Sequence, residues 1–129
     1  MIVLDASALV DVLVDAPTRL SIEEHLRSAD EVLAPELLLI EAASALWRLQ
    51  RGDLLTEADA SEGVSALQRF PVTLVSHDLL LDHAWQLRHS HRITDAFYVA
   101  LAAHLRVPLL TTDYRLARGV AGVSVISIA

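Results

Sequence analysis

The sequence of 129 residues contains neither cysteine nor lysine. The absence of cysteine excludes disulfide bonds and zinc sites built from thiolates. The absence of lysine excludes a Walker-type phosphate loop, which requires that residue. It also argues against receiver-type and haloacid-dehalogenase-type domains, which rely on a lysine beside their phosphorylated aspartate. Glycine is scarce, and the four glycines form no glycine-rich loop of the dinucleotide-binding type.

Long apolar runs are missing as well. Hydrophobic residues make up 53 % of the chain, yet charged residues and histidines interrupt every stretch. No run approaches the about 18 apolar residues that a membrane span needs. The apolar N-terminal residues have no basic segment ahead of them, which argues against a cleaved signal peptide. We therefore expect a cytoplasmic protein that makes no membrane contact.

Positive charge is scarce, and the formal net charge is −7. An acidic chain is a poor non-specific binder of nucleic acid, because contacts to phosphates dominate such binding. The balance changes if several of the acids are metal ligands. All ten basic residues are arginines, which suit bidentate phosphate contacts. Codon bias is the simpler explanation of the missing lysine, so composition alone does not identify a nucleic-acid partner.

Short apolar runs alternate with longer helical patterns along the whole chain. The runs predict strands over Ile2–Leu4, Val32–Ala34, Val72–Val75, Leu109–Thr111 and Val123–Ile128. The longer patterns predict helices over Ala6–Val14, Arg19–Ser28, Pro35–Arg51, Thr56–Phe70, Asp78–His89, Thr94–Leu105 and Tyr114–Arg118. Such alternation is typical of an α/β fold: a three-layer α/β/α sandwich around a mainly parallel sheet of about five strands. We expect one domain over residues 1–129.

Four carboxylates stand next to apolar segments, where an uncompensated charge is costly: Asp5, Glu41, Asp95 and Asp113. Asp5 and Asp113 follow predicted strands, and Asp95 begins a predicted helix. Since ligands of open α/β sheets bind beyond the carboxyl ends of strands, these residues can converge at one edge. A divalent cation is the simplest shared compensator, and hard oxygen ligands favour Mg²⁺ or Mn²⁺. This combination points to phosphate chemistry.

Each of these acids also has an ordinary structural explanation. Asp5 and Asp113 are favoured residues for capping helices, and Asp95 suits the first turn of a helix that Thr94 caps. Glu41 is the exception, because it lies inside a helix with no basic residue three or four positions away. The alternative for Glu41 is a surface position on a polar stripe.

Other polar residues carry weaker signals. Ser7 and Thr112 can hydrogen-bond a neighbouring carboxylate or a water, or can simply cap helices. The cluster of His83, His89 and His91 suggests zinc, but the absence of cysteine favours a solvated helix end.

Four segments in order resemble the motifs of PIN domains. They are Ile2–Leu9 around the first acid, the apolar helix around Glu41, Thr94–Ala102 around the third acid and Leu110–Leu116 around the last. Their order, spacing and total length match the compact VapC-type toxins of bacterial toxin–antitoxin systems. The resemblance covers essentially the whole chain, and no acidic position departs from it.

The resemblance implies a Mg²⁺- or Mn²⁺-dependent endoribonuclease that acts as a toxin. It implies a homodimer and a cognate antitoxin that blocks the site and mediates any DNA contact. The four acids would hold the metal, and Asp95 or Asp113 would orient the attacking water. Arg92 and Arg115 are our candidates for contacting RNA phosphates. A metal-dependent DNA nuclease or phosphatase would use the same residues. A non-catalytic PIN-like RNA-binding module is the other alternative; a missing acid would indicate it, and all four acids are present.

Overall fold

Five parallel strands form the centre of the computed structural model, which describes all residues 1–129. In chain order they are β1 (Ile2–Leu4), β2 (Val32–Pro35), β3 (Thr73–Val75), β4 (Leu109–Thr111) and β5 (Val125–Ser127). Their order across the sheet is β3-β2-β1-β4-β5. The chain therefore builds outward from β1 through β2 to β3, and then crosses back to place β4 beside β1. This confirms the predicted α/β class, and every pairing is parallel.

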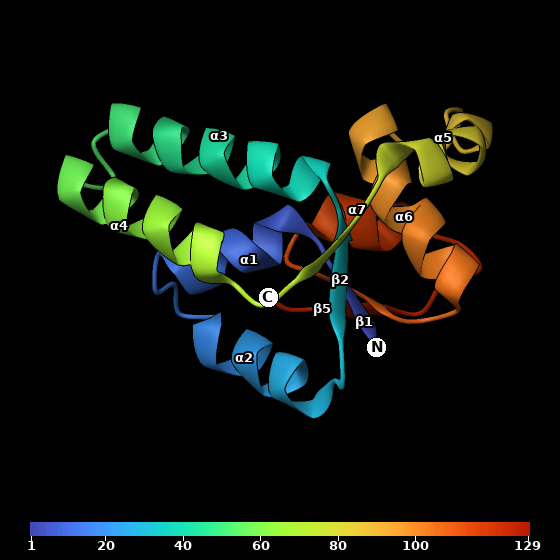
Figure 1. The fold of residues 1–129 in the computed structure, drawn as a ribbon, viewed down its shortest axis with the longest axis horizontal. Helices are drawn as coiled ribbons and strands as arrows, with labels where there is room; N and C mark the ends of the chain where they lie inside the picture. Colours follow the sequence, from blue (N-terminus) through green and yellow to red (C-terminus); the bar gives the residue numbers. More distant parts are fainter.

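Seven helices cover the two faces of the sheet (Figure 1). They are α1 (Ala6–Leu13), α2 (Arg19–Ser28), α3 (Leu37–Arg51), α4 (Glu57–Arg69), α5 (His77–Gln86), α6 (Ile93–Leu105) and α7 (Tyr114–Gly119). In Figure 1, α1 to α4 lie to the left of the strands, and α5 to α7 lie to the right. This is the predicted three-layer arrangement. None of the helices is both long and apolar enough to cross a membrane.

The chain leaves β1 and β4 toward opposite faces of the sheet: β1 leads into α1 on one face, and β4 leads into α7 on the other. Adjacent strands whose connections diverge in this way leave a crevice at their carboxyl ends. Asp5 directly follows β1, and Asp113 lies two residues beyond β4. The topology alone therefore brings the first and the last of the four acids to one place.

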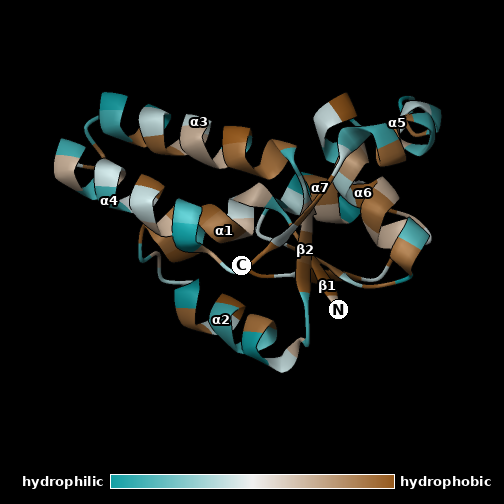
Figure 2. Ribbon diagram, in the orientation of Figure 1, coloured by the Kyte–Doolittle hydropathy of each residue, from teal (hydrophilic) through white to brown (hydrophobic).

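The hydrophobic core explains why α6 is apolar on all sides. Every residue from Ala96 to Ala102 is buried, since α6 packs against both the sheet and α5. Figure 2 shows the strands in brown, with teal at the outer ends of α3 and α4. This burial fixes the first turn of α6, and with it Asp95, near the carboxyl ends of the strands.

Two predicted helix starts are wrong. Pro35 is the last residue of β2, where it pairs with Val75 of β3, and the following helix begins at Leu37. Thr94 does not cap α6, because that helix begins at Ile93 with Arg92 at the capping position. Thr56, the first residue of a predicted helix, caps α4 instead, since its hydroxyl accepts a hydrogen bond from the Asp59 backbone N–H at 3.0 Å.

Candidate active site

One cavity brings all four predicted acids together. It has a volume of about 560 Å³, and Asp5, Glu41, Asp95 and Asp113 all line it. Asp5 and Asp113 reach it from the ends of neighbouring strands, Asp95 from the first turn of α6, and Glu41 from the second turn of α3. Ser7, Thr112 and Arg92 line the same cavity.

Asp5 occupies the N-cap position of α1, but its side chain is held by hydroxyl groups and does not cap the helix. It is only 5 % exposed, and its side chain accepts no capping hydrogen bond from α1. Instead its Oδ2 accepts hydrogen bonds from the hydroxyls of Ser7 at 2.5 Å and Thr111 at 2.7 Å. Each hydroxyl in turn accepts a backbone N–H, from Thr112 and Asp113 respectively. This network fixes the Asp5 carboxylate between α1 and the end of β4.

Burial raises the pKa of the Asp5 carboxyl, and the charges of Asp95 and Asp113 raise it further. The hydrogen bonds from Ser7 and Thr111 act in the opposite direction. No cation lies within ion-pair distance of Asp5 to offset its charge. When the carboxylates are ionised, the negative charge of Asp5 is therefore not balanced by a positive side chain of the protein.

Glu41 is paired with a buried phenol that the sequence did not single out. The Tyr98 hydroxyl donates a hydrogen bond of 2.7 Å to Glu41 Oε1, from the turn of α6 that follows Asp95. Burial raises the pKa of Tyr98 far above its usual value, so the phenol remains a donor at any working pH. Burial also raises the pKa of Glu41, and the charges of Asp5 and Asp95 add to this shift.

The other two acids interact with the protein more simply. Asp95 Oδ2 accepts a hydrogen bond of 3.3 Å from Arg92 Nε, in an ion pair whose arginine is largely exposed. Asp113 Oδ1 caps α7 by accepting the backbone N–H groups of Arg115 and Leu116. The capping role considered for Asp113 is therefore confirmed, and its other oxygen is free to serve in the cavity as well.

The four carboxylates share one pattern: one oxygen bonds to the protein and the other has no hydrogen bond. The free oxygens are Asp5 Oδ1, Glu41 Oε2, Asp95 Oδ1 and Asp113 Oδ2. No fully buried side-chain oxygen in the structure lacks a partner, so these unbonded oxygens are accessible to solvent, and the residues that carry them line the cavity. Free carboxylate oxygens from four directions are the donor type that Mg²⁺ and Mn²⁺ prefer.

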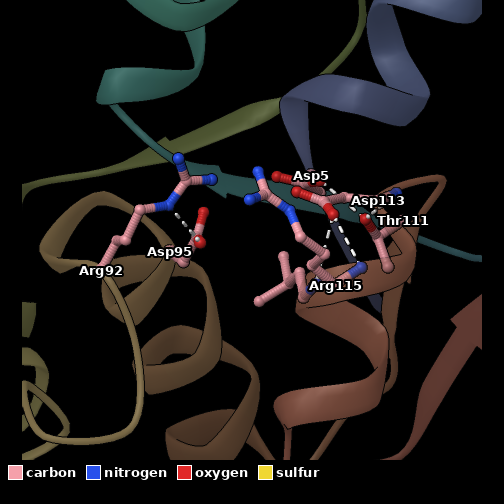
Figure 3. Close-up of polar contacts among 7 residues, drawn as sticks. Asp5, Arg92, Asp95, Thr111, Asp113 and Arg115 are labelled. Carbon is pink, nitrogen blue, oxygen red and sulfur yellow. Dashed lines mark hydrogen bonds and ion pairs between the residues drawn. The ribbon is translucent and has the colours of Figure 1, made fainter.

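Both candidate arginines lie beside the acids. Arg92 and Arg115 line a smaller cavity of about 210 Å³ that shares Asp95 with the main one. Figure 3 shows both side chains extending toward the side where Asp5, Asp95 and Asp113 present their carboxylates. Arg115 makes no ion pair, so its guanidinium is available to an anion.

The structure adds two supporting residues, Thr111 and Tyr98, to those named from the sequence. Thr112 contacts Ser7 through its backbone N–H, and the hydroxyl that bonds Asp5 belongs to Thr111. Register offers a signal for Thr111: Leu4 pairs with Leu110, so Asp5 and Thr111 are the next positions along the two strands. Tyr98 is three residues after Asp95, on the same face of α6.

The histidines form no metal site. No group of three histidine or acidic side chains is placed to hold one ion together. His83 and His89 are exposed, as expected for a solvated helix end.

Replacing Glu41 with glutamine is expected to stabilise the protein in metal-free buffer at neutral pH. Glutamine can still accept the Tyr98 hydrogen bond, while a charge that Asp5 and Asp95 repel is removed. We expect a gain of about 0.5–1 kcal/mol in the free energy of unfolding, typical of partly screened charges. Because the folded-state pKa of Glu41 is raised, the native protein loses stability as the pH rises through that pKa. The gain should therefore vanish below about pH 4, where Glu41 is protonated in both the folded and the unfolded protein.

Thermal unfolding from pH 4 to 8 measures this gain. Glu24→Gln is a matched control, because Glu24 is an exposed glutamate inside α2 without an ion pair. A lower melting temperature for Glu41→Gln at neutral pH would contradict the prediction, and would mean that ionised Glu41 stabilises the fold through Tyr98.

Sequence comparison identifies the family. The family model of the PIN domain matches residues 2–121. The chain is 41 % identical over 117 residues to Ribonuclease VapC3 of Mycobacterium tuberculosis. The aligned region covers 91 % of this chain and 85 % of VapC3.

Solved structures share the fold. The toxin VapC20 of Mycobacterium tuberculosis, described as cleaving the sarcin–ricin loop, superposes with a TM-score of 0.68 at 17 % identity. That match covers 96 % of this chain and 99 % of VapC20. VapBC2 of Rickettsia felis, solved with a DNA fragment from its promoter, gives a TM-score of 0.66 at 12 % identity over 100 % of both chains. With the PIN model spanning nearly the whole chain and a VapC ribonuclease at 41 % identity, this protein belongs to the PIN-domain family, among the VapC ribonucleases.

Proposed function

We propose that this protein is a divalent-metal-dependent endoribonuclease in which Asp5, Glu41, Asp95 and Asp113 form the catalytic centre. The observation that carries the proposal is the shared arrangement of these four side chains. Each has one oxygen held by the protein and one oxygen free in the same cavity. Such an arrangement orients the free oxygens in advance for a ligand that compensates their charge.

The donor set fits Mg²⁺ or Mn²⁺ in chemistry. No three of the carboxylates are placed to hold one ion together. Mg²⁺ usually binds proteins through one or two carboxylates and keeps several water ligands, so it does not require three. When bound, such an ion lowers the pKa of a water and neutralises charge on a phosphate. We assign Asp5, Glu41, Asp95 and Asp113 as the residues that would hold it, directly or through water.

The protein's own groups position the reactants. The free oxygen of Asp95 or Asp113 accepts a hydrogen bond from the attacking water and orients it toward the phosphorus atom. Arg92 and Arg115 bind the non-bridging oxygens of the phosphate from the smaller cavity. Ser7 and Thr111 keep Asp5 in place, and Tyr98 does so for Glu41.

The choice of RNA as substrate is supported by the relatives, whose names describe ribonucleases. It is tested by incubating the protein with matched RNA and DNA oligonucleotides of one sequence, and with a small chromogenic phosphodiester. We expect internal cleavage of the RNA only. Preferred cleavage of DNA would identify a DNA nuclease, and turnover of the small phosphoester alone would identify a phosphatase. Binding of RNA without cleavage of any substrate would identify a non-catalytic binding module.

We further propose that the protein is the toxin of a toxin–antitoxin pair, and that an antitoxin blocks the cavity and makes any contact to DNA. The description of VapBC2 with promoter DNA is consistent with this arrangement. A homodimer is supported by large exposed apolar side chains on α3 and α5, including Ile40, Trp47 and Trp85. The starts of these helices are joined by a hydrogen bond of 2.8 Å from Leu37 N–H to His77 Nε2.

A further inference from the structure

The main cavity continues well beyond the four carboxylates. Its outer part runs between α1 and α3 and is lined by Val10, Asp11, Ala45, Arg48, Leu49 and Leu54. Asp11 lies one helical turn beyond Ser7 on α1, and Ala45 and Arg48 lie one and two turns beyond Glu41 on α3. The total volume of about 560 Å³ is larger than a phosphate and a cation require. The two helices thus extend the site away from the acids.

Two charged side chains in this outer part, Asp11 and Arg48, have atoms that form no hydrogen bond or ion pair within the protein. Asp11 is partly buried, and its Oδ2 accepts a hydrogen bond of 2.7 Å from the Thr18 hydroxyl, which fixes the carboxylate. Its Oδ1 has no hydrogen bond, and no ion pair in the structure involves either Asp11 or Arg48. An acceptor and a donor therefore line one cavity, with apolar side chains of Val10 and Leu49 beside them.

This combination matches a nucleobase better than a phosphate. A base presents flat apolar faces together with donors and acceptors on its edge, whereas a phosphate would be repelled by Asp11. Aspartate accepts hydrogen bonds from amino groups of bases, and arginine donates to their carbonyl or ring-nitrogen acceptors. Because the cavity is continuous with the carboxylates, a group bound there belongs to the nucleotide next to the scissile phosphate.

We propose that Asp11, Arg48 and the apolar side chains of Val10 and Leu49 form a subsite for one base of the RNA adjacent to the cut, with Asp11 selecting a base that carries an amino group. The inference rests on the proposed ribonuclease function and names its specificity. Uracil is the base that this subsite disfavours, because it has no amino group and its N3–H lies between two carbonyl oxygens that the Asp11 carboxylate repels.

Cleavage of a random-sequence RNA pool, followed by sequencing of the new ends, tests the proposal. For the native protein we expect depletion of uracil at one position next to the cut. Asp11→Asn should reduce this discrimination by about 10-fold, the effect of losing one hydrogen bond to a charged acceptor. Asp15→Asn is the matched control, because Asp15 is exposed beyond α1 and its φ of 56° suits asparagine. It should retain the native preference.

Two further pairs of variants do not depend on Asp11. Ala45→Leu fills the subsite and should raise the KM for RNA by about 10-fold, whereas Ala43→Leu, on the exposed side of α3, should not. Arg48→Ala should relax the preference, while Arg51→Ala should not, because Arg51 stacks on Trp47 outside the cavity.

The outcomes separate this inference from the proposed function. RNA cleavage without any base preference beside the cut, or equal effects of each variant and its control, would overturn the subsite and leave the ribonuclease intact. Variants that cleave RNA normally but lose binding to an antitoxin would identify the outer cavity as a protein contact instead. Absence of RNA cleavage by the native protein would overturn both proposals.

Discussion

Asp95→Asn is expected to reduce RNA cleavage by about 10²–10³-fold, comparable to the loss of one preorganised charged group at an active site. Asp95 is the acid that both cavities share, so it lies between the other carboxylates and the two arginines. Asparagine keeps the shape of the side chain but removes the negative charge that a cation needs. It also removes the strongest acceptor available to orient a water. The rate of cleavage of a fluorogenic RNA measures the effect.

The fold should survive this substitution. The ion pair with Arg92 is solvent-exposed on the arginine side and contributes about 0–1 kcal/mol. The favourable interaction with the N-terminus of α6 contributes a similar amount. Asp59 offers a matched control, because it is the third residue of α4 as Asp95 is of α6, and it is exposed outside the cavity. Asp59→Asn should cleave normally, and full activity of Asp95→Asn would refute the site assignment.

Removal of divalent metal is expected to lower RNA cleavage to background. The chain carries a net charge of −7, and five carboxylates, the four acids and Asp11, line the cavity that receives RNA in the proposed function. Without a cation, the free oxygens of these carboxylates repel the phosphate, and three arginines, Arg48, Arg92 and Arg115, are too few to reverse the sign of the site. EDTA should therefore abolish cleavage, and an excess of Mg²⁺ or Mn²⁺ should restore it.

A folding control completes this experiment. Circular dichroism in EDTA should show the folded protein, since its helices and strands are joined by backbone hydrogen bonds and enclose an apolar core. EDTA already saturated with Mg²⁺ should leave cleavage unchanged. Cleavage that persists in metal-free EDTA would point to a nuclease of a different mechanism, and the four carboxylates would then need another role.

The sequence predicts the fold class, and it singles out the four acids that the structure places around one cavity, because both depend on short-range patterns. Alternation of apolar runs and helical periodicity identifies the elements, and an acid directly after a strand, such as Asp5, is visible without any structure. The order of the strands is less accessible, since it depends on the crossing from β3 back to β4 beside β1. Helix starts are also harder to predict: Pro35 is compatible with both a helix start and the end of a strand.

The supporting hydrogen bonds could not be predicted with the same success, because they join residues far apart in the chain. Thr111 is 106 positions from Asp5, and Tyr98 is 57 positions from Glu41. A threonine in a strand and a tyrosine in a buried helix are common for other reasons. Only the register of β1 against β4 distinguishes Thr111 from Thr112, and the sequence does not determine that register.

The two halves of the chain each carry two of the four acids. Asp5 and Glu41 precede the turn between α3 and α4, whereas Asp95 and Asp113 follow it. Neither half can assemble the set, and the strands that bring the halves together, β1 and β4, are neighbours only in the complete sheet. If these four acids form the catalytic centre, as proposed above, neither half is expected to cleave RNA alone. A protease that cuts the exposed turn and lets the halves separate should abolish RNA cleavage without altering any of the four acids.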